Sequence, residues 1–204
     1  MPDSQAREGA ALDELWLSCQ QRLVAHIAHD LKGALNGASV NVEVVRGRAE
    51  RPETKITEIS QYAGVAGDQL AIVIRMTTAL LTVSRAVRGP AEVATIARTF
   101  AALMDESFRV AGLKLEVVVD GGFSGPTSAS ASAVRLVLGE LFLLAAQQKK
   151  DLSVRLKATS PLTLEVTSTG SLELPKVVGD ALTANGIVIK TAGHGISISL
   201  PSPT

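Results

Sequence analysis

Ala-His-Ile-Ala-His-Asp-Leu-Lys-Gly-Ala-Leu-Asn, residues 25–36, is the stretch on which the interpretation of this chain depends. It lies within a longer run, residues 11–48, that contains no proline and whose apolar residues recur three or four positions apart. That spacing places the apolar side chains on one face of an α-helix, so we predict a single helix of roughly 35 residues. His29 and Asp30 stand side by side in its middle.

A second helix is predicted over residues 53–87, after the interruption at Pro52 and before the stop signal Gly89-Pro90. Two long helices joined by a short turn form a helical hairpin. One hairpin cannot cover the apolar face of both of its helices, whereas two hairpins paired into a four-helix bundle can. We therefore expect residues 1–89 to form one domain and to assemble as a homodimer.

The pattern changes after Pro90, and residues 90–204 are predicted to form a second domain. Helical spacing alternates there with short runs of period two. The expected helices are residues 91–110 and 130–148, and the expected strands are 113–119, 153–158, 162–168, 187–190 and 196–200. This order predicts an α+β sandwich, a mostly antiparallel sheet with helices on one face.

The charge balance argues against a nucleic-acid or membrane partner. Lys+Arg and Asp+Glu are both 20, and an anionic partner requires a basic face. The most apolar stretch, residues 133–146, contains Arg135 and Glu140 and is too short to cross a bilayer. Residues 1–9 are polar, unlike a signal peptide, and the single Cys19 excludes an intramolecular disulfide. We expect a soluble, cytoplasmic protein.

From His29 to Leu35 the chain reads His, acid, Leu, basic residue, two small residues, Leu. This order resembles the phosphoacceptor box of bacterial sensor histidine kinases, although Ala34 stands where that family usually has proline. Residues 80–85, Leu-Leu-Thr-Val-Ser-Arg, are similar to the end of the family's second hairpin helix. The resemblance covers nearly the whole chain. It implies a dimerisation and histidine phosphotransfer hairpin followed by an ATPase-like α/β domain.

The ATP-binding motifs of that family are missing from the second domain. The family's Leu-x-Asn-Leu-Leu-x-Asn-Ala helix corresponds to residues 138–145, and its Mg²⁺-binding Asn is replaced by Leu144, which cannot ligate a hard cation. The adenine-binding Asp of Asp-x-Gly corresponds to Ser168, in Ser168-Thr169-Gly170. Residues 171–185 contain no Gly-x-Gly lid motif. The sequence therefore predicts a degenerate domain that does not bind ATP in the family's way.

A kinase-like dimer with its His but without its ATP site resembles the dedicated histidine phosphotransferases of two-component phosphorelays. The resemblance implies that response-regulator receiver domains are the partners, and that the Mg²⁺ belongs to the receiver rather than to this chain. Two alternatives stay open. One is a non-catalytic pseudokinase scaffold that binds a kinase or response regulator, and the other is a histidine kinase with an aberrant nucleotide site.

His29 is the predicted phosphoacceptor, through one nitrogen of a neutral imidazole. Asp30 is expected to hydrogen-bond the other nitrogen or to act as a base, and Lys32, three residues on, to offset phosphoryl charge. Asn36 shares this face of the helix and, with Gly33, is predicted to contact the partner. The alternative for each side chain is an ordinary solvated helix surface. We expect no bound cofactor and no metal, since nothing completes a ligand set with His26 and His29.

Overall fold

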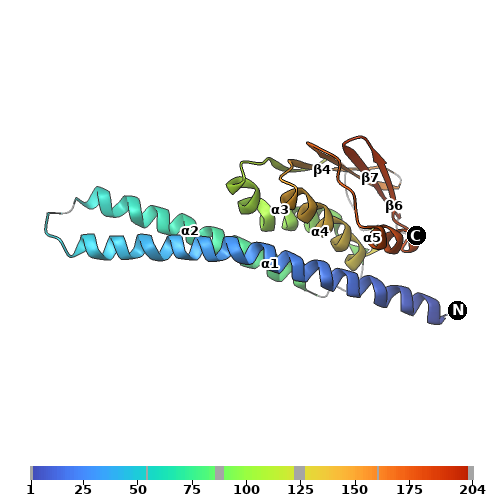
Figure 1. The fold of residues 1–204 in the computed structure, drawn as a ribbon, viewed down its shortest axis with the longest axis horizontal. Coiled ribbons are helices and arrows are strands. Elements are labelled where there is room, and N and C mark those ends of the chain that lie inside the picture. The colour runs from blue at the N-terminus through green and yellow to red at the C-terminus, as the bar shows by residue number, and fades with distance from the viewer. Residues whose placement is uncertain (1, 54, 86–89, 122–126, 160, 202–204) are drawn as a thin grey trace.

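The computed structural model describes residues 2–53, 55–85, 90–121, 127–159 and 161–201. Its first two helices, α1 (Pro2–Ala49) and α2 (Ile56–Ser84), form the predicted antiparallel hairpin (Figure 1). Helix α1 begins well before residue 11, where its predicted range started. Helix α2 ends at Ser84, and the predicted stop at Gly89 lies outside the described residues.

The rest of the chain forms the expected α+β domain. A five-stranded sheet has the order β2-β4-β5-β7-β6, in which β2 and β4 are parallel and the other neighbours antiparallel. Helix α5 and a small two-stranded sheet, β1 with β3, were not predicted. The elements are β1 (Pro90–Ala91), α3 (Val93–Val110), β2 (Leu115–Val119), β3 (Thr127–Ser130), α4 (Ala131–Gln147), β4 (Leu152–Lys157), β5 (Leu162–Ser168), α5 (Lys176–Ala184), β6 (Val188–Ala192) and β7 (Gly195–Leu200).

Alternating side chains attach the sheet to the helices beneath it. On β4, β5 and β7 every second residue is buried, as a strand with one covered face requires. Helix α4 begins at a side-chain cap, because the Ser130 hydroxyl accepts a hydrogen bond from the Ala133 amide at 3.2 Å. Along α4 nearly every residue is buried, which is expected of a helix covered on opposite sides.

The second cover of α4 is the hairpin itself. Figure 1 shows α3 and α4 lying between the hairpin and the sheet, and α1 packs directly against α4. Trp16 of α1 meets Phe100 of α3 edge-to-face, with ring centroids 6.3 Å apart, and Phe100 lies 5.7 Å from Phe142 of α4. The hairpin and the second domain therefore share one hydrophobic core, and the predicted domain boundary at residues 89 and 90 stays a prediction.

Candidate functional site

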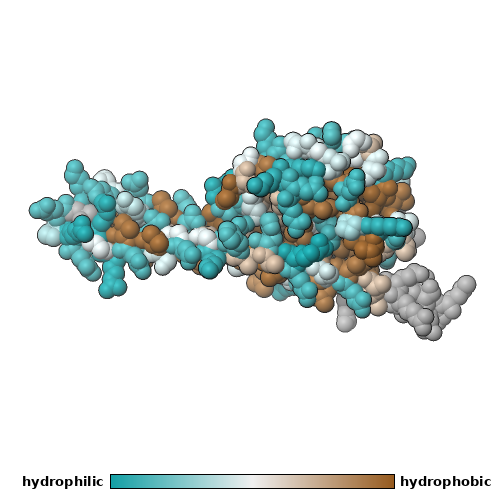
Figure 2. Space-filling view, viewed as in Figure 1, coloured by the Kyte–Doolittle hydropathy of each residue, from teal (hydrophilic) through white to brown (hydrophobic). Residues whose placement is uncertain are grey.

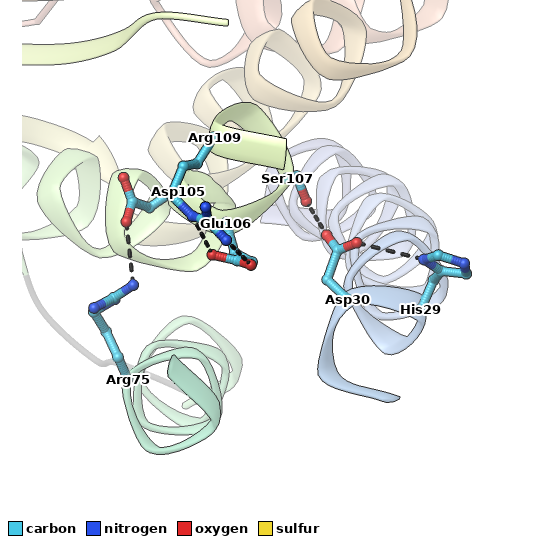
Figure 3. Close-up of polar contacts among 7 residues, drawn as sticks. All are labelled: His29, Asp30, Arg75, Asp105, Glu106, Ser107 and Arg109. Atoms are coloured by element: carbon cyan, nitrogen blue, oxygen red, sulfur yellow. Dashed lines mark hydrogen bonds and ion pairs between the residues drawn. The ribbon is translucent and has the colours of Figure 1, made fainter. Parts of the chain in front are cut away.

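His29 lies on the outer surface of α1, at the level where the C-terminal end of α3 approaches the hairpin (Figure 3). Its side chain is 92% exposed, whereas Ile27, two residues earlier, is fully buried. The helical period produces this difference, because the face that carries Ile27 packs onto the second domain. The imidazole is thus open to a large partner.

Asp30 lies between His29 and the second domain. Its Oδ1 is 3.5 Å from His29 Nδ1, and its Oδ2 accepts a hydrogen bond from the Ser107 hydroxyl of α3. The Asp30 side chain is only 17% exposed, so α3 covers most of it. Figure 3 shows the three side chains in a row, with His29 at the outer end. The structure therefore brings a residue of each domain to the predicted site.

This arrangement distinguishes the two ring nitrogens of His29. A neutral imidazole has one N–H donor and one lone-pair acceptor. A carboxylate facing Nδ1 favours the proton on that nitrogen, which leaves the Nε2 lone pair pointing away from Asp30. The geometry thus presents Nε2 as the nucleophilic atom, as a positioned carboxylate does for a catalytic histidine in general.

The other predicted residues line the exposed face beside His29. Lys32 and Asn36 are exposed, and neither side chain has a hydrogen bond or ion pair within the part of the chain that the structure describes. A Cβ at Gly33 would meet no atom within 4 Å. The structure thus places Lys32, Gly33 and Asn36 near His29, while their contact with a partner stays a prediction.

Charged pairs on α3 border the site on the other side. Arg75 of α2 reaches Asp105 of α3 at 3.2 Å, which links the hairpin to the second domain a second time. Glu106 accepts two hydrogen bonds from the Arg109 guanidinium, at 2.8 and 2.6 Å. The hydrogen bond to Glu106 raises the pKa of Arg109 above its ordinary value. Figure 3 shows Asp105, Glu106 and Arg109 beside Ser107 on the same helix, with Arg75 reaching across from α2.

The helix that resembles the Mg²⁺-binding helix of the kinases faces α1. Glu140 is fully buried, and its carboxylate accepts a hydrogen bond from the half-exposed Arg22 guanidinium of α1. A Cβ at the neighbouring Gly139 would lie 2.8 Å from the Cys19 sulfur, so the helices approach closely at a residue without a side chain. Leu144 packs against the hydrophobic core. Helix α4 therefore holds the hairpin and the second domain together.

The residues that correspond to the family's Asp-x-Gly motif, 168–170, also make contacts within the chain. The Ser168 hydroxyl donates to the carbonyl of Gly170, two residues on. The Lys150 side chain lies over Gly170, where an added Cβ would be 2.9 Å from Lys150 Cε, and its ammonium donates to the Ser171 carbonyl. No carboxylate stands at the position that the resemblance assigns to adenine binding.

No protein-family model matches the chain, and no curated protein matches it. Three solved structures similar to it are histidine kinases. AdeS of Acinetobacter baumannii is 12% identical with a TM-score of 0.44, and the match covers 86% of this chain and 98% of AdeS. ThkA in complex with the response regulator TrrA has the same identity and score, over 96% of this chain and 65% of that one. The histidine kinase domain of the blue-light activated kinase EL346 from Erythrobacter litoralis is 14% identical with a TM-score of 0.38, over 96% and 93%.

The structure itself has the predicted architecture, a helical hairpin followed by an α+β domain. The three matches are similarities in structure. With TM-scores below 0.5 and such low identities, they establish no activity. Ser107 was not predicted from the sequence, because it lies 77 positions from Asp30. Glu140 carried a signal that could have been used, since an acidic residue in the middle of an apolar helix must find a buried cationic partner.

Proposed function

We propose that this protein is a histidine phosphotransferase of a two-component phosphorelay, and that His29 carries a phosphoryl group between receiver-domain aspartates. The observation that carries the proposal is an exposed imidazole whose Nδ1 faces a carboxylate and whose Nε2 has no hydrogen-bond partner among the described residues. Phosphoryl transfer requires little covalent chemistry from the protein beyond position and charge. His29 with Asp30 supplies the first, and the exposed Lys32 ammonium supplies the second.

The transfer forms one N–P bond and breaks one O–P bond. Nε2 of the neutral imidazole attacks the phosphorus of a receiver aspartyl phosphate, the N–P bond forms, and the acyl O–P bond breaks to release the receiver carboxylate. The ring then carries the phosphoryl group and a positive charge, with its proton still on Nδ1. The Asp30 carboxylate faces that proton and stabilises the charge, and the reverse reaction loads a second receiver.

The proposal excludes ATP as the direct donor on the grounds of side-chain chemistry. An aliphatic residue, Leu144, cannot replace a metal-binding amide, and the Ser168 hydroxyl lacks the negative charge and the second oxygen of a carboxylate acceptor. The helix with the first of these residues also holds the hairpin through Glu140. A domain attached to the hairpin in this way suits a phosphate carrier better than a kinase, whose ATP-binding domain must move its nucleotide to the histidine.

The proposed assembly is a homodimer formed through the hairpin, in the cytoplasm, with receiver domains as the partners and Mg²⁺ supplied by the receiver. Helix α2 is long and apolar enough to cross a membrane by length and composition alone. Two observations argue against a membrane span. Asp68 and Arg75 are exposed on α2, and charges are costly inside a bilayer. The charged helix α1 packs along α2 as well.

The decisive experiment follows labelled phosphate from a phosphorylated receiver domain to the purified full-length chain. We expect acid-labile, base-stable label on the wild type, as a phosphoramidate requires. His29→Gln should take no label and should remain folded, while His26→Gln, altered one helical turn away, should keep most of the transfer.

The alternatives give different results. Normal labelling of His29→Gln, or acid-resistant label, would exclude His29 as the acceptor. A wild type that binds receivers without taking label would be the scaffold, and labelling from ATP would indicate the kinase.

A further inference from the structure

We infer that Ser107, on α3 of the second domain, is a positioning residue of the phosphotransfer site: it fixes the Asp30 carboxylate, which in turn selects the reactive tautomer of His29. This inference rests on the proposed function. It assigns a role in the transfer to a domain whose ATP-binding motifs are lost, since the second domain then completes the site.

A hydrogen bond between Ser107 and Asp30 connects the second domain to the hairpin at this site. The Ser107 hydroxyl donates to Asp30 Oδ2, which leaves Oδ1 to face His29 Nδ1. A serine hydroxyl has one proton to donate, and here it is used in the hydrogen bond to the Asp30 carboxylate. An aspartate on an exposed helix surface would otherwise sample several rotamers, and only those that turn an oxygen toward His29 affect the ring. The hydrogen bond from α3 favours such a rotamer.

The helix that carries Ser107, α3, is held rigidly by its packing. Phe100, Leu103, Met104 and Phe108 of α3 are buried in the shared core, so the helix cannot rotate freely about its axis. Ser107 lies one residue before Phe108, on the side of α3 that faces α1. A side chain supported by a packed helix is held more precisely than one on a mobile loop.

The fixed position of the Asp30 carboxylate affects the reactivity of His29 Nε2. With the proton on Nδ1, the Nε2 lone pair is available to phosphorus, and the ring becomes positive as the N–P bond forms. A fixed carboxylate at Nδ1 opposes that charge without reorganising during the reaction. Removing Ser107 should therefore lower both the population of the reactive tautomer and the stabilisation of the charged product.

The test uses the 204-residue chain and five variants of it. Single-turnover transfer from a saturating phosphorylated receiver should be slower in Ser107→Ala by about tenfold or more, the size expected when a charged group loses a hydrogen bond. The affinity for the receiver should stay unchanged. Ser107→Thr keeps a hydroxyl and should restore the rate. In an Asp30→Ala background, Ser107→Ala should cause no further loss, because the two residues act through one interaction.

Arg75→Gln is the matched control for domain docking. It removes a second polar contact between the hairpin and α3, the ion pair with Asp105, without touching Asp30. Wild-type rates in this variant would show that Ser107 acts on the site itself. Equal slowing by Arg75→Gln and Ser107→Ala would overturn the inference, because docking alone would then explain both.

A spectroscopic measurement separates this inference from the proposed function. Nitrogen-15 NMR of the unphosphorylated protein reports which ring nitrogen of His29 carries the proton. We expect the Nδ1–H form to dominate in the wild type and the Nε2–H form to gain population in Ser107→Ala. Identical tautomer populations in the wild type and in Ser107→Ala would refute the positioning role of Ser107, even if His29 proves to be the phosphoacceptor. A shift in the populations would support it even if the phosphoryl donor is not a receiver.

Discussion

Cys19 shows how the interface between the domains changes the chemistry of a single side chain. The thiol is fully buried between α1 and α4, next to the Glu140 carboxylate. Burial, and then the negative charge of Glu140, raise the pKa of the Cys19 thiol far above its ordinary value. The thiolate is the nucleophilic form of cysteine, so Cys19 should resist alkylation as long as the chain is folded.

This raised pKa predicts a pH-dependent stability. Above about pH 8.5, the unfolded chain loses the thiol proton while the folded chain keeps it. The free energy of unfolding should therefore decrease as the pH rises through this region, by up to about 1.4 kcal/mol per pH unit. Urea titrations between about pH 7.5 and about pH 9.5 measure the slope. Cys19→Ala should remove this component, and an unchanged slope in the variant would assign the effect to another group.

Gly33 permits a substitution that separates stability from partner binding. It lies in the interior of α1 beside His29, is exposed, and has room for a Cβ. Gly33→Ala should raise the free energy of unfolding by about 0.5–1 kcal/mol, because glycine loses more backbone entropy in a helix. If a receiver packs on this face, the same variant should weaken receiver binding and raise the KM of transfer. A more stable variant with an unchanged KM would remove Gly33 from the predicted partner surface.

At the scale of elements, the contact between α1 and α4 is the part of the fold that tolerates least change. Gly139→Ala would place a Cβ 2.8 Å from the Cys19 sulfur and 3.4 Å from a methyl group of Leu23. Overpacking of a buried contact costs about 1–3 kcal/mol. We expect a loss of that size in urea unfolding, and Cys19→Ala in the same chain should recover part of it. Additive losses in the double variant would show that the two positions do not compete for space.

The sequence predicted helices α1 to α4 and the five strands of the main sheet, but not α5 or the short strands β1 and β3. The hairpin, α4 and the β4–β5 pair follow from periodicity sustained over many residues. Helix α5 was missed because nine residues that follow Pro175 and include Gly179 give a weak helical signal. At the candidate site, the motif pointed to His29, Asp30 and Lys32 because they are close together in the sequence. Ser107 and the pair of Arg22 with Glu140 depend on how two distant helices meet, which no local pattern encodes.

For the whole molecule, the distribution of exposed apolar side chains supports the proposed dimer. Figure 2 shows hydrophobic side chains lying among hydrophilic ones on one face of the hairpin stem. Exposed leucines, isoleucines and valines recur on α1 seven or eleven residues apart and on α2 four, seven or fourteen apart, which keeps each set on one side of its helix. These two sets are Leu17, Val24, Leu35 and Val42 on α1, and Ile56, Leu70, Ile74 and Leu81 on α2, whereas the exposed Val40 and Val65 lie outside them.

A charge placed in these stripes should dissociate the dimer without unfolding the chain. Leu35→Glu and Ile74→Glu alter side chains that are 49% and 65% exposed in one chain, so neither removes a contact of the shared core. In a four-helix bundle the same carboxylates would be buried without partners, which is strongly unfavourable. Light scattering should give a dimer for the wild type and a monomer for each variant, with unchanged circular dichroism. Val177→Glu is the matched control, because Val177 is similarly exposed but lies on α5, outside the two apolar stripes of the hairpin helices. A monomeric wild type, or dimers that survive both hairpin charges, would refute the bundle and leave the apolar face of the hairpin to a different partner.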